Sequence, residues 1–376
     1  MKKTLHFHSL YLGALQGLVC LMSACDATIH QYPEPVTDTE FVVQLNCDRT
    51  PPPFYREIAY DADGNRTETM LEAEASPSYM PDDRLDLRFV VEIRDNNQVD
   101  AEGTPKTIAR RELTVNNDAL PPQAELHFTL PSRGDYTAVS WCDYVPAANP
   151  DDWHFDTSTL DFVQVNLENT MQELHHKNSG TGYSNFGIGW AGAVQVTSTT
   201  RSLGATTRAD AEEVPVENQE GLVPVYMTRP AGRLRLYTED LAEFQQSSGM
   251  NIEDVRVIII YKQFVSVAYD ALAQAPCQWI STRRTETHPT VVNETGNVCL
   301  AYDYVFTDSE EETHVLADFY FLDAEGNELS HTTNVDVPLR RNRETVIRGR
   351  FLTQDIGEGG LEVDEGFDDE FVIVVP

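Results

Sequence analysis

The amino-acid sequence predicts an all-β protein with two β-sandwich domains in tandem. Three observations lead to this prediction. Many short segments alternate apolar and polar residues with a period of two, which is typical of half-buried strands. Turn-forming residues separate these segments at short intervals, and few segments have helical periodicity. The strand pattern also restarts after a polar stretch, and 376 residues are enough for two domains.

The first half contains the segments expected to form the first sandwich. The first strand begins near Phe41, where Phe41, Val43 and Leu45 share one face. Residues 48–83 contain three successive prolines, an Asp-Gly pair and many charges, so a long loop is expected there. A glycine-rich stretch at 178–192 is expected to be a packed loop or an edge strand. The other expected strands span residues 85–94, 107–115, 124–130, 135–145 and 160–167.

The second half repeats this pattern. Val255–Tyr261 is apolar on both faces, which predicts a central buried strand. A short helical turn is expected at residues 240–245, and a hairpin turn at Ala324-Glu325-Gly326-Asn327. The other expected strands span residues 223–227, 233–237, 298–306, 314–322, 332–338, 344–353 and 370–375.

The residue composition indicates where the domain boundaries are expected. Residues 198–220 are rich in Thr, Glu, Ala and Asp, so they are expected to form a linker or exposed loop. Two prolines near Tyr32 favour an extended tether. The expected segments are a signal peptide (1–24), a lipidated tether (25–38), an N-terminal β-sandwich domain (39–197), the linker (198–220) and a C-terminal β-sandwich domain (221–376).

The N-terminus has the features of an export signal. Lys2 and Lys3 precede an apolar run from Leu10 to Met22, and small residues follow before Cys25. The run is shorter than the roughly 20 apolar residues of a membrane-spanning helix. The sequence Ser23-Ala24-Cys25 resembles a bacterial lipobox, in which the thiol is acylated and cleavage leaves the cysteine as the first residue. We therefore expect lipidation at Cys25; an ordinary signal peptide that ends near a cysteine is the alternative.

Net charge and cysteine content restrict the partners and the covalent structure. A formal charge of -34 argues against nucleic-acid binding, because phosphate contacts need basic surfaces. Export permits disulfides among the other mature cysteines, and four cysteines allow three pairings. Cys277 and Cys299 flank a polar stretch and are one candidate pair, while buried free thiols are the alternative. The four cysteines are Cys47, Cys142, Cys277 and Cys299.

No catalytic, cofactor-binding or metal-binding motif is recognisable in the sequence. There is no Gly-x-Ser-x-Gly, no His-Glu-x-x-His and no P-loop. His175 and His176 are adjacent, so their side chains would point apart in a regular element. The acidic clusters at 308–312 and 364–370 do not have EF-hand spacing and are expected to be solvated loops. The sequence therefore predicts no enzyme and no cofactor.

The four tryptophans have two interpretations. Trp141 lies in an alternating strand, which favours a place in the core. Trp153, Trp190 and Trp279 are candidate platforms for a sugar ring, because exposed aromatic faces suit such ligands.

Several motifs of the first half resemble the first domain of FimB-type fimbrial subunits, which are Bacteroidetes-type lipoproteins that anchor fimbriae. Leu87-Arg88-Phe89-Val90-Val91-Glu92 is similar to an early strand of that family. Cys142 stands where the family usually has a small residue between a Trp and an Asp. The signature itself comprises Gly134-Asp135-Tyr136, Trp141-Cys142-Asp143-Tyr144-Val145, Trp153 and Leu160-Asp161-Phe162-Val163.

The resemblance continues through the second half. Residues 225–231, Val-Tyr-Met-Thr-Arg-Pro-Ala, are similar to the strand that opens the second domain of the family. Residues 337–349 resemble its late hairpin, and Cys25-Asp26 with Ile29–Pro33 resemble its first mature residues. The resemblance thus spans nearly the whole mature chain, with five motifs in the same order.

The resemblance implies two tandem transthyretin-like Greek-key β-sandwich domains. It also implies a lipid-anchored fimbrial subunit at the cell surface, most simply the anchor at the base of a fimbria assembled by donor-strand exchange. Its partners would be other fimbrial subunits, bound by strand addition, and the outer membrane, bound through the lipid on Cys25. The apolar C-terminal strand at 370–376 would either complete the second sandwich or pair with a neighbouring subunit.

Two other function classes remain open from the sequence. A glycan-binding surface lipoprotein would need two or three exposed aromatic side chains on one face. A glycoside hydrolase would need two carboxylates about 5 to 9.5 Å apart in a cleft.

Replacing the expected lipid acceptor should release the protein from the membrane. In Cys25→Ala the thiol that accepts the acyl chains is absent, so we expect the chain in the soluble fraction or as an uncut precursor. Cell fractionation followed by mass measurement of the N-terminus checks this. Unchanged membrane association together with normal signal removal would contradict it.

Overall fold

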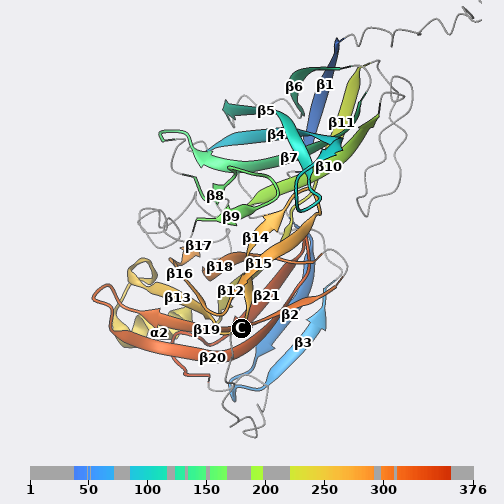
Figure 1. The fold of residues 1–376 in the computed structure, drawn as a ribbon. Helices are drawn as coiled ribbons and strands as arrows, with labels where there is room; N and C mark the ends of the chain where they lie inside the picture. Colours follow the sequence, from blue (N-terminus) through green and yellow to red (C-terminus); the bar gives the residue numbers. More distant parts are fainter. Residues whose placement is uncertain are drawn as a thin grey trace, which may run out of the picture. The chain divides into compact units, whose positions relative to one another are not determined.

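The described part of the chain folds mainly into β-strands, which confirms the all-β prediction (Figure 1). The one α-helix of the described residues is α2 (Leu241–Ser248), and a short 3-10 helix, η4 (Ile252–Asp254), follows it. Among these residues, no helix is both long and apolar enough to cross a membrane. The structure is a computed structural model and describes residues 38–48, 50, 52–71, 85–116, 123–131, 134–149, 153–166, 188–197, 221–291, 298–308 and 311–356.

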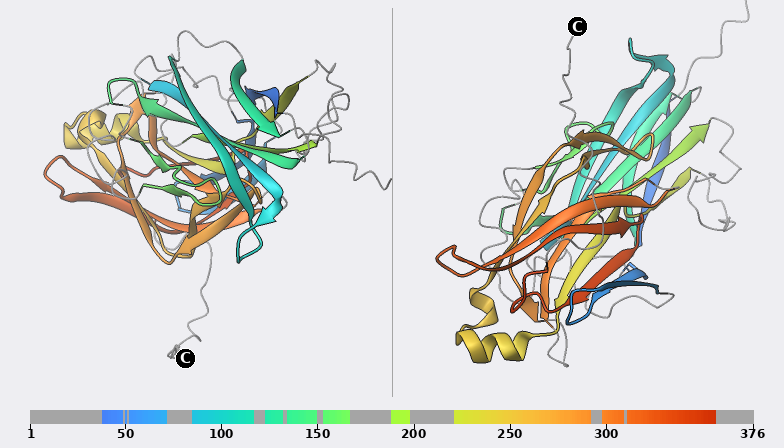
Figure 2. Two further views of the ribbon diagram at one scale, coloured as in Figure 1. Left: turned by 45° about the horizontal axis from the view of Figure 1, so that its top comes forward. Right: turned by 90° about the horizontal axis from the view of Figure 1, so that it is seen from below.

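The first-half sandwich is built from two sheets of unequal size. We call them the β1 sheet and the β4 sheet. In strand order, the β1 sheet contains β11 (Leu222–Met227), β1 (Asp38–Cys47) and β6 (Gln123–Pro131). The β4 sheet contains β10 (Gly189–Thr197), β7 (Asp135–Pro146), β4 (Leu85–Val99) and β5 (Pro105–Asn116). Figure 2 shows β4, β5 and β7 as long strands that lie side by side.

Three further sheets follow among the described residues. The β12 sheet contains, in order, β17 (Thr290–Val291), β18 (Val298–Phe306), β12 (Ala231–Thr238), β21 (Glu344–Gly349), β2 (Phe54–Tyr60) and β3 (Arg66–Met70). The β13 sheet contains β16 (Arg283–Thr287), β13 (Arg256–Tyr261), β19 (Thr313–Leu322) and β20 (Glu328–Leu339). The β14 sheet contains β15 (Ala275–Ile280), β14 (Val265–Asp270), β9 (Val163–Val165) and β8 (Phe155–Asp156).

Alternating apolar side chains form the core of the first sandwich. On β4, Leu87, Phe89, Val91 and Ile93 face inward and are at most 3% exposed. On β1, Phe41, Val43 and Leu45 are buried as the alternation predicts, and the Phe41 ring stacks on Phe128 of β6 at 5.8 Å. The period of two therefore identified the inward face of these strands correctly.

The second sandwich has its core between the β12 and β13 sheets. One cluster of buried side chains joins both sheets and includes Leu234 and Leu236 of β12, Val257 and Ile259 of β13, and Phe319 of β19. Phe244 of α2 adds to this cluster. β13 lies inside its sheet between β16 and β19, as its largely apolar sequence predicts.

Strands from the two sides of the expected linker pair with each other in three sheets. β1 pairs in parallel with β11, from Val42 opposite Leu222 to Cys47 opposite Met227. β2 pairs in parallel with β21, and in Figure 1 the blue β2 lies beside the red β21. β9 pairs with β14 in the third case. Each half of the chain therefore completes sheets that the other half begins.

Contacts between Cα atoms divide the chain into two units. The large unit comprises residues 41–128 and 134–376, and the small unit comprises residues 1–40 and 129–133. Of the small unit, the structure describes the first residues of β1 and the last residues of β6. The expected domain boundaries, 39–197 and 221–376, stay a prediction.

The expected long loop at 48–83 is wrong in its middle part, because β2 and β3 lie there. Ile58 and Tyr60 of β2 are buried in the second-half core, although charged residues surround them in the sequence. The parallel partner β21 lies almost 290 residues away, so no local pattern could indicate it. The Asp-Gly pair does mark the hairpin turn, since Gly64 has a φ of 82° and Asp61 accepts hydrogen bonds from the turn.

Other differences from the sequence prediction are smaller. The expected strand at 160–167 is reduced to β9, and the expected helical turn at 240–245 extends to Ser248, where Gly249 ends the helix with a φ of 70°. The strands β14, β15 and β16 were not predicted. Cys277 and Cys299 do not form a disulfide with each other.

Trp141 fills a core that both halves of the chain share. It is fully buried, and its ring packs against Phe155 at 5.1 Å, Tyr269 at 6.3 Å and Phe306 at 6.4 Å. Gly189 of the neighbouring strand leaves room for it, because a Cβ there would lie 2.4 Å from the ring. The prediction that Trp141 belongs to the core is confirmed.

Truncating Trp141 should destabilise the fold strongly. Trp141→Ala removes a ring from a shared core, so we expect the free energy of unfolding to fall by about 3–5 kcal/mol. The control is Trp279→Ala, since Trp279 is 53% exposed and its loss should change stability by less than about 0.5 kcal/mol. Denaturant titration of both variants checks this, and equal midpoints would contradict the assignment.

His314 should make stability depend on pH. Burial lowers the pKa of His314, but hydrogen bonds to Asp336 and Glu312 and their charges outweigh this effect, so the pKa is raised. A raised pKa means that the protonated ring stabilises the fold below its unfolded pKa of about 6.5, and that this contribution disappears as pH rises through the folded pKa. His314→Asn should therefore lose more stability at pH of about 5.5 than at about 8.5. An equal loss at both values would contradict the prediction.

Candidate functional site

The segment between β1 and β2 connects the first sandwich to the second, and we call it the crossing. One arginine holds it in place. Arg229 follows β11, and its guanidinium lies 5.3 Å from the ring of Trp190. It donates hydrogen bonds to the carbonyl of Thr50 and, at 2.9 Å, to the side chain of Asn342. The indole of Trp190 donates to the carbonyl of Asp48 at 2.7 Å. The crossing is therefore fixed to both the β10 strand and the β20–β21 turn.

A second arginine continues this arrangement. Arg341 donates to the hydroxyl of Thr228 at 3.0 Å and to the carbonyl of Arg229 at 3.3 Å. Its guanidinium also lies 5.7 Å from the ring of Tyr269 on β14. The two second-half motifs on which the family resemblance rests, 225–231 and 337–349, are thus in direct contact.

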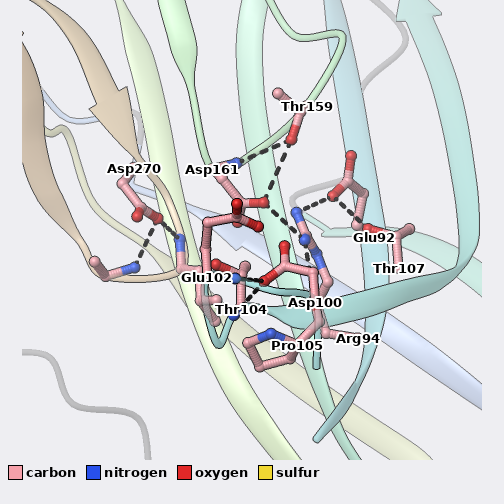
Figure 3. Close-up of polar contacts among 12 residues, drawn as sticks. Glu92, Arg94, Asp100, Glu102, Thr104, Pro105, Thr107, Thr159, Asp161 and Asp270 are labelled. Carbon is pink, nitrogen blue, oxygen red and sulfur yellow. Dashed lines mark hydrogen bonds and ion pairs between the residues drawn. The ribbon is translucent and has the colours of Figure 1, made fainter. Parts of the chain in front are cut away.

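A buried polar cluster lies where the β4 sheet meets the β14 sheet (Figure 3). Arg94 of β4 is 3% exposed and donates to the carboxylate of Asp161 at 2.8 Å, to Glu92 and to the carbonyl of Pro105. Arg110 of β5 donates to the other oxygen of Glu92 at 2.6 Å. Two arginines therefore share one buried glutamate, and one of them reaches the loop before β9.

Second-half groups approach the same cluster. Burial raises the pKa of Asp270, at the end of β14, and the nearby charge of Asp161 adds to the effect, while hydrogen bonds from the backbone oppose it. Burial and the charges of Asp270 and Asp161 raise the pKa of the Cys277 thiol to about 11. A thiol of this kind is a poor nucleophile at neutral pH, because the thiolate is the reactive form.

Another arginine, held by an ion pair within the β4 sheet, attaches β8 to that sheet. Arg88 of β4 donates two hydrogen bonds to the fully buried carboxylate of Asp143, at 2.9 and 2.6 Å, and a third to the carbonyl of Phe155. Two parallel hydrogen bonds of this kind set both distance and orientation. The polar face of β4 thus carries groups that attach the β8–β9 segment.

The chemistry of these clusters is structural. Their carboxylates already bind guanidinium groups, and no group of three metal-ligating side chains is found within the described ranges. In the acidic stretch at 308–312, the carboxylate of Glu312 is likewise occupied by protein partners, which are Arg56, Tyr55 and His314. The geometry is that of a junction between sheets.

The candidate sugar platforms lie in different environments. Trp190 is fully buried, and Trp153 is half-buried. Trp279 on β15 is 53% exposed, and Phe264, which directly precedes β14, is 74% exposed. Since Val265 pairs with Ile280, both aromatic side chains belong to the same end of the β14–β15 hairpin.

Several predicted features lie outside the described residues. They include the lipid acceptor Cys25, the pair His175-His176, the acidic stretch at 364–370, the linker at 198–220 and the C-terminal strand at 370–376.

The sequence analysis missed the buried ion pairs. Arg88, Glu92 and Arg94 alternate with apolar residues in the sequence, and the structure shows that all three are buried. One signal was present: the paired strands β4 and β7 place Arg88 opposite Asp143, and an acid amid the apolar residues of β7 needs a buried partner.

Several solved structures share a low similarity with this chain. A candidate adhesin from Bacteroides ovatus is 12% identical, with a TM-score of 0.36 over 80% of this chain and 78% of that chain. The fimbrial anchor protein Mfa2 from Porphyromonas gingivalis is 10% identical, with a TM-score of 0.33 over 79% and 83%. A fimbrial assembly protein from Parabacteroides distasonis is 9% identical, with a TM-score of 0.28 over 83% and 91%. These values are too low to carry an argument about function.

No protein of curated function matches the chain. One family model does, and it covers residues 54–181 and 196–376. Because this match extends over more than half of the sequence, the chain belongs to the family of unknown function DUF6562.

Proposed function

We propose that this protein is a lipid-anchored fimbrial subunit at the cell surface, which acts as the anchor at the base of a fimbria. The observation that carries the proposal is strand sharing. β11 adds to the edge of β1, and β2 adds to the edge of β21, each across more than 170 residues of sequence. In a fimbria assembled by donor-strand exchange, the same physical interaction takes place between chains, where main-chain hydrogen bonds give affinity.

The N-terminal sequence supports the anchoring part of the proposal. Cys25 would carry the acyl chains, and each buried methylene contributes about 0.8 kcal/mol to membrane binding. The tether from Cys25 to β1 would separate the folded part from the outer membrane. The ordered motifs shared with FimB-type subunits add to this, because two of them form the crossing at Arg229 and Arg341.

The polar clusters support a structural role over a catalytic one. Glu92 and Asp161, the acidic groups at the junction, bind Arg94, so they are occupied by partners that a general acid or base would have to give up. A subunit that resists pulling forces needs such links between its sheets. The ion pair of Arg94 with Asp161 and the hydrogen bond from Arg88 to the carbonyl of Phe155 provide them at the β4–β14 junction.

One observation favours a second candidate function, a glycan-binding surface lipoprotein. Trp279 and Phe264 are exposed at one end of the β14–β15 hairpin, and exposed aromatic rings suit the apolar faces of sugars. A loss of glycan binding in Trp279→Ala, with fimbriae unaffected, would favour this alternative.

The anchor proposal predicts where fimbriae are found when the protein is absent. Cells that lack the chain should shed fimbriae into the medium, because the base of each fimbria has lost its membrane attachment. The wild-type chain should restore attachment, whereas Cys25→Ala should not. Electron microscopy and quantification of shed fimbriae measure this. If cells without the protein keep the same number of attached fimbriae, the anchor role is wrong.

A further inference from the structure

The turn that joins β20 to β21 carries three arginines without acidic partners. Arg340, Arg341 and Arg343 make no ion pair with any residue that the structure describes. Arg340 and Arg343 are exposed, whereas Arg341 is half-buried and donates only to neutral oxygen atoms. Because the chain has 27 basic residues against 61 acidic ones, three neighbouring arginines without a carboxylate are an exception in this protein.

The turn holds two of these charges close together. The amide of Arg343 donates to the carbonyl of Arg340 at 3.1 Å, and Asn342 between them has a φ of 54°. In a tight turn of this kind the first and fourth Cα atoms are less than about 7 Å apart. Two exposed guanidinium groups at this spacing repel each other, and an anion bound to both removes the repulsion.

Two carboxylates border the turn, and both are already bound. Glu344 directly follows the turn, but it is fully buried and forms ion pairs with Arg233 and Arg235 of β12. Glu312 precedes the residue that pairs with the last residue of β20, and it is held by the partners described above. The turn is therefore a cationic surface that lacks a carboxylate partner among the described residues.

The last described residue directs the rest of the chain toward this turn. Ile356 pairs in parallel with Thr332 of β20, and two main-chain hydrogen bonds fix this direction. The chain therefore leaves the described part running the same way as β20, which ends at the turn. Arg340 lies eight residues beyond Thr332, and Asp364 lies eight residues beyond Ile356. Eight extended residues span about 26 Å, so an acidic segment that begins at Asp364 can reach the turn.

We propose that residues 364–370 of this chain bind to the turn of Arg340, Arg341 and Arg343. The segment is Asp-Glu-Gly-Phe-Asp-Asp-Glu, so five of its seven residues carry a carboxylate. These carboxylates pair with the exposed guanidinium groups of Arg340 and Arg343, and hydrogen bonds between such ionised groups are among the strongest that side chains form. The inference replaces the expected solvated loop at 364–370 by a bound segment, and it does not depend on the anchor function.

Binding of this segment ties the C-terminal part of the chain to the crossing between the sandwiches. Asn342 and Arg341 belong to the same turn, and both contact Arg229, which holds the crossing through the carbonyl of Thr50. A carboxylate that bridges Arg340 and Arg343 removes the repulsion within the turn. The bound segment therefore stabilises the turn and, through Arg229, the position of the crossing.

A crosslink that keeps the charge of the turn tests the contact directly. Arg343→Lys retains the positive charge and supplies an amine, which a carbodiimide joins to a carboxylate in contact with it. In the purified whole chain, peptide mass spectrometry should find an amide bond between position 343 and residues 364–370. The matched control is Arg111→Lys, because Arg111 is also exposed and makes no ion pair within the described ranges, yet it lies over Phe128 of the first sandwich. No bond to residues 364–370 is expected there.

Protease access to the segment gives a second measurement. Replacing both Arg340 and Arg343 by Gln removes the exposed charges, so a glutamate-specific protease should cut after Glu365 and Glu370 about fivefold faster than in the parent. The increase is modest because exposed ion pairs are weak one by one. Arg111→Gln should change the rate by less than about twofold. Thermal unfolding of each variant identifies any loss of folding.

Several results would overturn the proposal. A crosslink from position 343 to residues 198–220 would show that another acidic segment of the chain is the partner, and a crosslink to a second molecule would assign the turn to contacts between chains. Absence of a crosslink to residues 364–370 in Arg343→Lys would show that the segment is not bound there. Equal cleavage rates in the double variant and in Arg111→Gln would show the same. None of these results bears on the anchor function, which the fimbrial experiment above tests separately.

Discussion

The fold depends on one constraint: neither half of the chain contains all the strands that its sheets need. β1 lies between β6 and β11, and β11 belongs to the second half of the sequence. β2 lies beside β21, although it precedes nearly all first-half strands. Parallel pairs require long connections, so the chain must cross between the sandwiches early and return late. Arg229 and Trp190 fix the first of these crossings, and Trp141 fills the core that both halves share.

Buried ion pairs and hydrogen bonds fix the arrangement of the β4 and β14 sheets at the junction between them. Removing one partner of a buried pair typically costs about 3–5 kcal/mol, because the other charge stays buried without compensation. The ion pair of Arg94 with Asp161 and the hydrogen bond from Arg88 to the carbonyl of Phe155 therefore favour the arrangement in which the β8–β9 segment covers the β4 sheet. The pairs of Arg88 with Asp143 and of Arg94 with Glu92 hold these two arginines in place within the β4 sheet. An apolar junction of equal area would permit sliding, whereas directional hydrogen bonds do not. The same rigidity would suit the proposed role, in which the subunit transmits force from a fimbria to a membrane.

The sequence predicted the local structure well and the long-range pairing poorly. Alternation in residues 41–45 and 87–93 identified both the strands and their buried faces, because one face of each strand meets a core. β2 was missed, since only Ile58 and Tyr60 face the core and their partner strand is far away in the sequence. The burial of Arg88 and Glu92 could not be predicted, because alternation distinguishes two faces of a strand but cannot show that a second layer covers the polar one. Lipidation of Cys25 stays a prediction from the sequence alone. The exposed Trp279 was one of three candidate sugar platforms until the fold separated them.

Hydrogen exchange of the native protein tests strand sharing most directly. Ile58 of β2 and Ile347 of β21 are register partners, and both side chains are fully buried in one core. If β2 is an integral strand of the β12 sheet, the amides of residues 54–60 should be protected to the same degree as those of residues 344–349, because both exchange only when the sheet opens. Rapid exchange of residues 54–60 while residues 344–349 stay protected would show that β2 does not belong to the sheet, and it would contradict the account of a chain whose halves complete each other.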